Sequence, residues 1–168
     1  LGVRIDDGIV AGLISFAVGL MALLTLVPLI PSTRAAAGRL IDGIRTRTIP
    51  VWMLLGGACG ALTVSTQGVV AGVLGVSLFT VGVVAGQTLH GLLLDRIGFG
   101  PAGVVAVTPG RVVGGALALL AVCISIGGDV LHQAPVWLLV LPVLAGAGIA
   151  WQAGANGRLA KTVSSPIA

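Results

Sequence analysis

Uncharged stretches dominate the hydrophobic pattern of this chain, and the longest runs from Thr48 to Leu94 without one Asp, Glu, Lys or Arg in 47 residues. A single helix of that length would rise about 70 Å at about 1.5 Å per residue, more than twice the ~30 Å hydrocarbon core of a bilayer. The stretch therefore predicts two membrane crossings. Because Gly72 and Gly75 interrupt the apolar pattern, we place the turn between the crossings around residues 71–76.

The same pattern predicts three further apolar helices. Pro31 closes the first of them, and Pro142 predicts a kink in the last. Residues 31–50 are predicted to form a polar loop, and Asn156 is expected to cap the last helix before Gly157. The fold class is an all-α polytopic transmembrane bundle, because a β-barrel would show short alternating strands. Its five predicted spans cover residues 8–30, 51–70, 76–94, 111–126 and 135–156.

The composition places this bundle in a lipid bilayer. Hydrophobic residues make up 57% of the chain and charged residues 8%, and the mean hydropathy is +1.14, whereas an ordinary soluble domain is about 25% charged. The cations lie in short loops between spans, so they set the orientation in the membrane and do not indicate a nucleic-acid partner. Cys59 and Cys123 lack clustered partners, so we expect small buried residues there and not a disulfide or metal site. We expect no cofactor.

The charges are divided unequally between the two ends of the spans. Counting crossings places eight cations in the loops of one side and only Arg4 on the other. The positive-inside rule assigns the basic side to the cytoplasm, so we expect loop 31–50 and the C-terminal segment to be cytoplasmic. The eight cations are Arg34, Arg39, Arg45, Arg47, Arg96, Arg111, Arg158 and Lys161.

Small and polar residues recur at offsets of three and four within the spans, which puts each set on one helix face. Such faces are expected to contact other helices or a water-filled cavity, because lipid offers their hydrogen bonds no partner. Gly56 to Gly60 and Gly82 to Gly86 also have the Gly-x-x-x-Gly spacing that favours helix packing. The three faces are Gly56, Gly60, Thr63 and Gln67; Ser77, Thr80, Val84, Gln87 and Gly91; and Ala145, Gly148, Gln152 and Asn156.

Gln87 is the first candidate for substrate binding, because an amide near the middle of a span can both donate and accept hydrogen bonds. The alternative is an interhelical hydrogen bond that stabilises the bundle. His90 lies one turn further along and could respond to protons or bind an anion, or it could be structural. Thr80 belongs to the same face as Gln87.

Several further side chains carry the same pair of alternatives. Gln67 and Thr63 could touch substrate or simply pack against another helix. Trp151 could stack on a flat or cationic ligand, or anchor a helix end at the interface. Gln152 and Asn156 could line a gate or cap the end of their helix, and the cap is favoured for Asn156. No Asp or Glu lies within a predicted span, so the sequence offers no proton-coupling carboxylate there.

The two ends of the chain resemble each other. Leu1–Val10 and Leu159–Ala168 share Leu at their first position and Ile at their ninth. Five spans lie between these segments, and an odd number of spans would invert the second copy relative to the first. Inverted repeats of this kind are typical of secondary transporters.

Four segments resemble the YdcZ-like (EamA-like) branch of the drug/metabolite transporter superfamily. They are residues 8–20 (GIVAGLISFAVGL), 52–62 (WMLLGGACGAL), 83–98 (VVAGQTLHGLLLDRIG) and 151–168 (WQAGANGRLAKTVSSPIA). The resemblance implies a ten-helix protein of a bacterial-type inner membrane, built from two inverted five-helix repeats. This chain would then be a single bundle fragment, from the end of helix one of the first repeat through the first helix of the second. Its partners would be the remaining helices and, as a further option, a second copy in a homodimer.

The leading functional hypothesis is therefore a secondary transporter that exports a small metabolite or drug-like molecule by alternating access. The alternative is a non-transporting membrane scaffold or assembly subunit whose polar residues only join helices. We do not expect an enzyme, because no His, Asp or Cys cluster suggests a metal or a nucleophile. We also expect residues 1–168 alone to be inactive, because missing helices would leave packing faces exposed to lipid.

Overall fold

The structure is a computed structural model that describes residues 8–125 and 135–164. All the regular elements of these residues are helices, joined by turns and loops, which confirms the all-α fold class. The order is α2 (Gly8–Leu29), α3 (Pro31–Arg45), the short 3-10 helix η1 (Val51–Leu55), α4 (Gly56–Leu74), α5 (Val76–Arg96), α6 (Pro109–Ser125) and α8 (Val136–Ser164).

Four of the described helical segments are long and apolar enough to cross a membrane: residues 10–29, 51–74, 76–96 and 137–164. The fifth predicted span corresponds to α6, which is apolar but has only 17 residues. A fifth crossing therefore stays a prediction. The helix breaks fall where the sequence places them: α2 ends before Pro31, and Gly75 separates α4 from α5 with φ 80° and ψ 154°.

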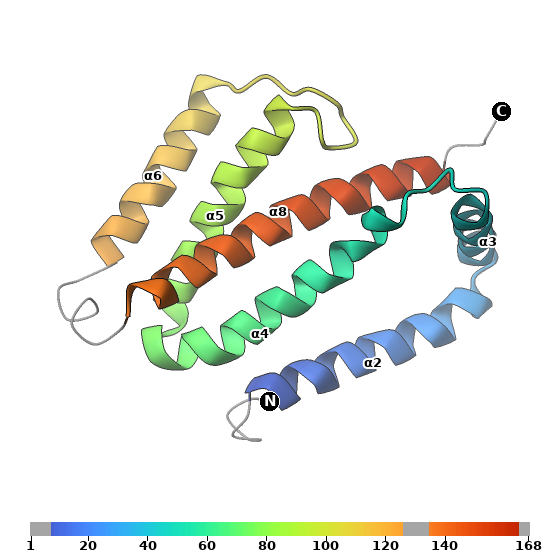
Figure 1. The fold of residues 1–168 in the computed structure, drawn as a ribbon, viewed down its shortest axis with the longest axis horizontal. Coiled ribbons are helices and arrows are strands. Elements are labelled where there is room, and N and C mark those ends of the chain that lie inside the picture. The colour runs from blue at the N-terminus through green and yellow to red at the C-terminus, as the bar shows by residue number, and fades with distance from the viewer. Residues whose placement is uncertain (1–7, 126–134, 165–168) are drawn as a thin grey trace.

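The predicted polar loop 31–50 is wrong over most of its length, because residues 31–45 form helix α3. Pro31 occupies the start of this helix, where its missing N–H costs nothing. The helix is amphipathic: its arginines are exposed, whereas residues at helical spacing are partly covered. Figure 1 shows α3 nearly end-on beside helices that run across the view, so it lies across the end of the bundle. The partly covered residues are Thr33, Ala36, Ala37, Leu40 and Ile44.

The predicted helix end at Asn156 is also wrong. α8 continues through Asn156 and Gly157 to Ser164, 29 residues in all. Tertiary contacts explain the continuation: a Cβ on Gly157 would touch the ring of Pro101 at 2.8 Å, and the Asn156 side chain lies against Gly56 rather than capping its own helix. The segment after Gly157 consists mostly of good helix formers, which favours the same outcome.

Helix α8 lies in the middle of the bundle, between α5 and α4 (Figure 1). α6 flanks α5 on one side and α2 flanks α4 on the other. Val70 of α4, Phe79 of α5 and Leu138 of α8 form a buried apolar cluster where the three central helices meet. By contrast, only 11% of the apolar segment of α2 is buried, so most of its side chains are available to lipid or to further helices.

Glycines set the distance between α5 and α8. A Cβ on Gly82 would meet the Pro142 ring at 2.7 Å, and one on Gly86 would overlap the carbonyl of Val143. Gly146 of α8 is placed in the same way against the carbonyl of Val83. The spacing Gly82-x-x-x-Gly86 therefore marks a helix-packing face, as predicted, because only glycine lets these two backbones approach so closely.

Candidate functional site

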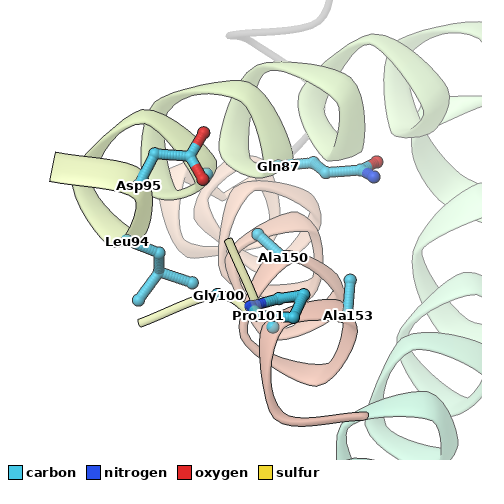
Figure 2. Close-up of a pocket in the computed structure, with 9 residues that line it drawn as sticks. Gln87, Leu94, Asp95, Gly100, Pro101, Ala150 and Ala153 are labelled. Carbon is cyan, nitrogen blue, oxygen red and sulfur yellow. The ribbon is translucent and has the colours of Figure 1, made fainter. Parts of the chain in front are cut away.

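A pocket of about 320 Å³ opens beside the crossing of α5 and α8. Figure 2 shows Gln87, Leu94 and Asp95 projecting from α5, with Ala150 and Ala153 on α8 and the loop residues Gly100 and Pro101 beside them. Gly91 and Gly154 complete the lining. We call this cavity the Gln87 pocket.

Small residues make this pocket possible. Gly91, Ala150 and Ala153 leave room where two helices would otherwise fill the space with side chains, and Gly154 lies against the Phe99 ring. Gln87 and Asp95 supply the polar side chains of the lining. The Gln87 side chain makes no hydrogen bond to any other described residue. Its amide is therefore available to a ligand both as a donor and as an acceptor.

Asp95 was not among the candidates from the sequence. Its carboxylate forms an ion pair with Arg111 at the start of α6, and its backbone carbonyl accepts a hydrogen bond from Val105 at 2.9 Å. The connection between α5 and α6 thus folds back onto the end of α5. The sequence did contain a signal, because Asp95 and Arg111 have opposite charges at the two ends of this connection. The pair leaves the pocket close to electrically neutral.

Thr63 and Gln152 lie outside the Gln87 pocket, on the contact between α4 and α8. Thr63 donates a hydrogen bond to the carbonyl of Cys59 at 2.9 Å and approaches the carbonyl of Ala145 at 3.5 Å. The side chain of Gln152 packs against Gly56 and Gly60 of α4: a Cβ built on either glycine would lie 3.3 or 3.5 Å, respectively, from a Gln152 side-chain atom. Both residues thus contribute to helix packing in this structure.

Thr80, Gln67 and His90 are not brought into the pocket either. Thr80 is exposed and donates a hydrogen bond to the carbonyl of Val76 in its own helix at 2.8 Å. Gln67 is exposed on α4, and His90 is half-buried on α5. Of the predicted candidates, the Gln87 pocket therefore contains Gln87 alone.

Trp151 belongs to an aromatic cluster at the end of the bundle. Its ring centroid lies 6.1 Å from that of Trp52 and 6.0 Å from that of Phe99, and Trp52 and Phe99 are 5.7 Å apart. The guanidinium of Arg158 lies 5.3 Å from the Phe99 ring centroid. These contacts connect three elements: η1, α8 and the loop that follows α5. Trp151 therefore helps to hold that loop in place beside the pocket.

Together, the long apolar helices and the way they pack define a polytopic helical membrane protein with an open pocket beside the crossing of α5 and α8. A family model matches residues 1–124, with the description "DMT_YdcZ: Putative inner membrane exporter, YdcZ". The chain belongs to this family. The match covers α2 to α6 and ends before α8. Searches of curated proteins and of solved structures found no match.

Proposed function

We propose that this chain forms part of a secondary transporter that exports a small metabolite or drug-like molecule by alternating access. Membership of a family described as inner membrane exporters supports this proposal. The observation that carries it is the Gln87 pocket, whose lining includes an exposed amide that makes no hydrogen bond to another described residue. The pocket runs along the C-terminal half of α5 to the loop after it, and Gln87 is the α5 residue of its lining nearest the middle of that helix. Secondary transporters bind their substrates at about that depth.

The lining of the pocket favours a small substrate of low net charge. A volume of about 320 Å³ is at the lower end of the range for small-molecule sites. Asp95 is paired with Arg111, so the wall offers little uncompensated charge. The amide of Gln87 would orient a hydrogen-bonding group on an otherwise compact, partly apolar molecule.

The alternative function is a membrane scaffold, and a specific observation favours it. Gln87, Gln67 and Gln152 do not share one cavity: Gln87 lines the pocket, Gln152 packs against α4 and Gln67 is exposed. A protein whose polar residues only join helices would show such scattering. The transport proposal rests on Gln87 and not on the set of three.

Thermal unfolding of the full-length protein in detergent tests the proposal, with a panel of metabolites and lipophilic cations as ligands. A compound that binds only the folded state stabilises it by about 2.7 kcal/mol at a hundredfold excess over Kd. We expect at least one compound to raise Tm in the unaltered protein and in Gln67→Ala, which removes an exposed glutamine, but not in Gln87→Ala.

Two results would contradict the proposal. A shift in Tm that survives Gln87→Ala would move the binding site away from this pocket. A panel that leaves Tm unchanged, combined with no uptake or efflux of any compound by reconstituted vesicles, would favour the scaffold.

A further inference from the structure

A second pocket, of about 530 Å³, lies at the end of the bundle that carries the aromatic cluster. It shares Gly100 and Pro101 with the Gln87 pocket, so the loop after α5 forms a wall common to both. We call it the basic pocket, because its charged residues are Arg158 and Lys161 of α8. The rest of the lining is Met53, Gly98, Gly100, Pro101, Ala102, Gly103 and Thr162.

The two cations of this pocket have no acidic partner among the described residues. The acidic residues among those that the structure describes are Asp42 and Asp95. Asp95 pairs with Arg111, and no ion pair joins Asp42, Arg158 or Lys161 to another described residue. Two positive charges therefore border one concave surface without compensation, which attracts anions.

Both cations are held in place by contacts that leave donors available. The guanidinium of Arg158 is 5.3 Å from the centroid of the Phe99 ring, an interaction that leaves its N–H groups free for a ligand. The ammonium of Lys161 donates to the carbonyl of Pro101 at 3.3 Å, which uses one of its three donors. Part of the entropic cost of ordering these side chains is thus met before a ligand arrives.

The loop adds backbone donors to the same surface. Gly100 and Ala102 both line the basic pocket, and their N–H groups make no hydrogen bond to another described residue. The N–H groups of Phe99 and Gly103, by contrast, are engaged by the carbonyls of Leu94 and Gly100. Loops that combine available amides with Arg and Lys are suited to oxyanions.

We propose that the basic pocket binds a phosphate-bearing anion between Arg158, Lys161 and the loop 98–103. The pocket volume leaves room for a group esterified to that phosphate. Two sources share this chemistry: the headgroup of an anionic phospholipid in the adjacent leaflet, and a soluble phosphate. This inference does not depend on transport, because Arg158, Lys161 and Ala102 line the basic pocket and not the Gln87 pocket.

Binding to the purified full-length protein in neutral detergent tests this site. The probes are short-chain phosphatidylglycerol, short-chain phosphatidylcholine and inorganic phosphate, and the readout is the Kd measured by titration at low and at moderate salt. We expect saturable binding of phosphatidylglycerol or phosphate, weakened about tenfold in Lys161→Gln and about a hundredfold in Arg158→Gln/Lys161→Gln. Arg34→Gln/Arg45→Gln, which removes two exposed charges of α3, is the matched control and should keep the original Kd.

The probes also separate the two sources. Tight binding of phosphatidylglycerol with no competition by phosphate assigns the site to lipid, and mutual competition assigns it to the phosphate group itself. An equal loss of affinity in the control pair would overturn the proposal, because it would indicate diffuse surface attraction. The side chain of Lys161 is exposed, so its replacement should not prevent folding. An unchanged Kd in Lys161→Gln would therefore overturn the proposal too, and so would a protein that binds neither anion.

Discussion

At the scale of single residues, Gly75 determines how α4 turns into α5. Its φ of 80° and ψ of 154° lie in a region of backbone conformation that is essentially confined to glycine. A Cβ at this position would meet no atom within 4 Å. The requirement for glycine is therefore conformational and not one of space.

We predict that Gly75→Ala lowers the free energy of unfolding by about 1 to 3 kcal/mol, because alanine must adopt a strained conformation there. Gly72→Ala is the matched control: it also has open space around a Cβ, but it lies inside α4, where alanine is the better helix former. It should leave stability equal or slightly higher. Unfolding of the full-length protein by dodecyl sulfate in mixed micelles measures both, and equal effects would contradict the prediction.

The small residues of the α5 and α8 contact illustrate what spacing can predict. Gly82 and Gly86 are four apart, so a packing face followed directly from the sequence. The partner did not, because nothing in the spacing says that the carbonyl of Val143 lies opposite Gly86. Asp95 shows the same limit: its pairing with Arg111 depends on how the connection between α5 and α6 folds back.

At the scale of elements, α3 is the main departure from the sequence prediction. The four arginines between residues 34 and 47 favour a polar loop for residues 31–50 when the sequence is taken alone. The helical spacing of Thr33, Ala37 and Leu40 was a competing signal, and their partial burial decides between the two. An amphipathic helix across the end of a bundle is suited to the membrane surface, where basic side chains meet lipid headgroups.

Cysteine scanning tests this helix. In a background in which Cys59 and Cys123 are replaced by alanine, cysteines are placed one at a time at Ala35, Ala36, Ala37 and Gly38. Ala35 and Gly38 are exposed, whereas Ala36 and Ala37 are partly covered and line a groove against α8. We expect maleimide to label the first two positions several-fold faster than the other two. A loop would give similar rates at all four.

At the scale of the whole molecule, the basic residues gather at one end of the bundle. Arg39 of α3 donates to the carbonyl of Val163 in α8 at 2.6 Å, and Lys161 reaches the carbonyl of Pro101. Arg111 is joined to the end of α5 through Asp95. The alternation of predicted spans placed these cations on one side of the membrane. The contacts of Arg39, Lys161 and Arg111 lie at one end of the bundle, in agreement with that prediction. Which compartment that end faces stays a prediction.

We predict that this end faces the cytoplasm, because positive loops are retained there. A membrane-impermeant maleimide should label Gly38→Cys, in the same cysteine-free background, in inside-out vesicles. It should fail to do so in right-side-out vesicles until they are permeabilised. A cysteine placed at Val76, the exposed first residue of α5 at the opposite end of the bundle, is the reciprocal control, and labelling of Gly38→Cys from the outside would reverse the assigned orientation.

The sequence was sufficient for the helical class and for most helix limits, because apolar length and Pro or Gly breaks decide them locally. It was insufficient for the order of helices in space. The place of α8 between α4 and α5 depends on shape, through glycines that meet Pro142 and Val143. The Gln87 pocket follows from this order, so only Gln87 itself could be chosen from the sequence.

The central position of α8 has a consequence for biosynthesis. α8 begins at Val136, 40 residues after α5 ends at Arg96, which corresponds to about 2 to 8 s of translation. During that interval α4 and α5 are already made, but the helix that separates them is not. Their glycine faces must either rest against lipid or pair provisionally. In the second case the provisional pair has to part before α8 can pack against both helices.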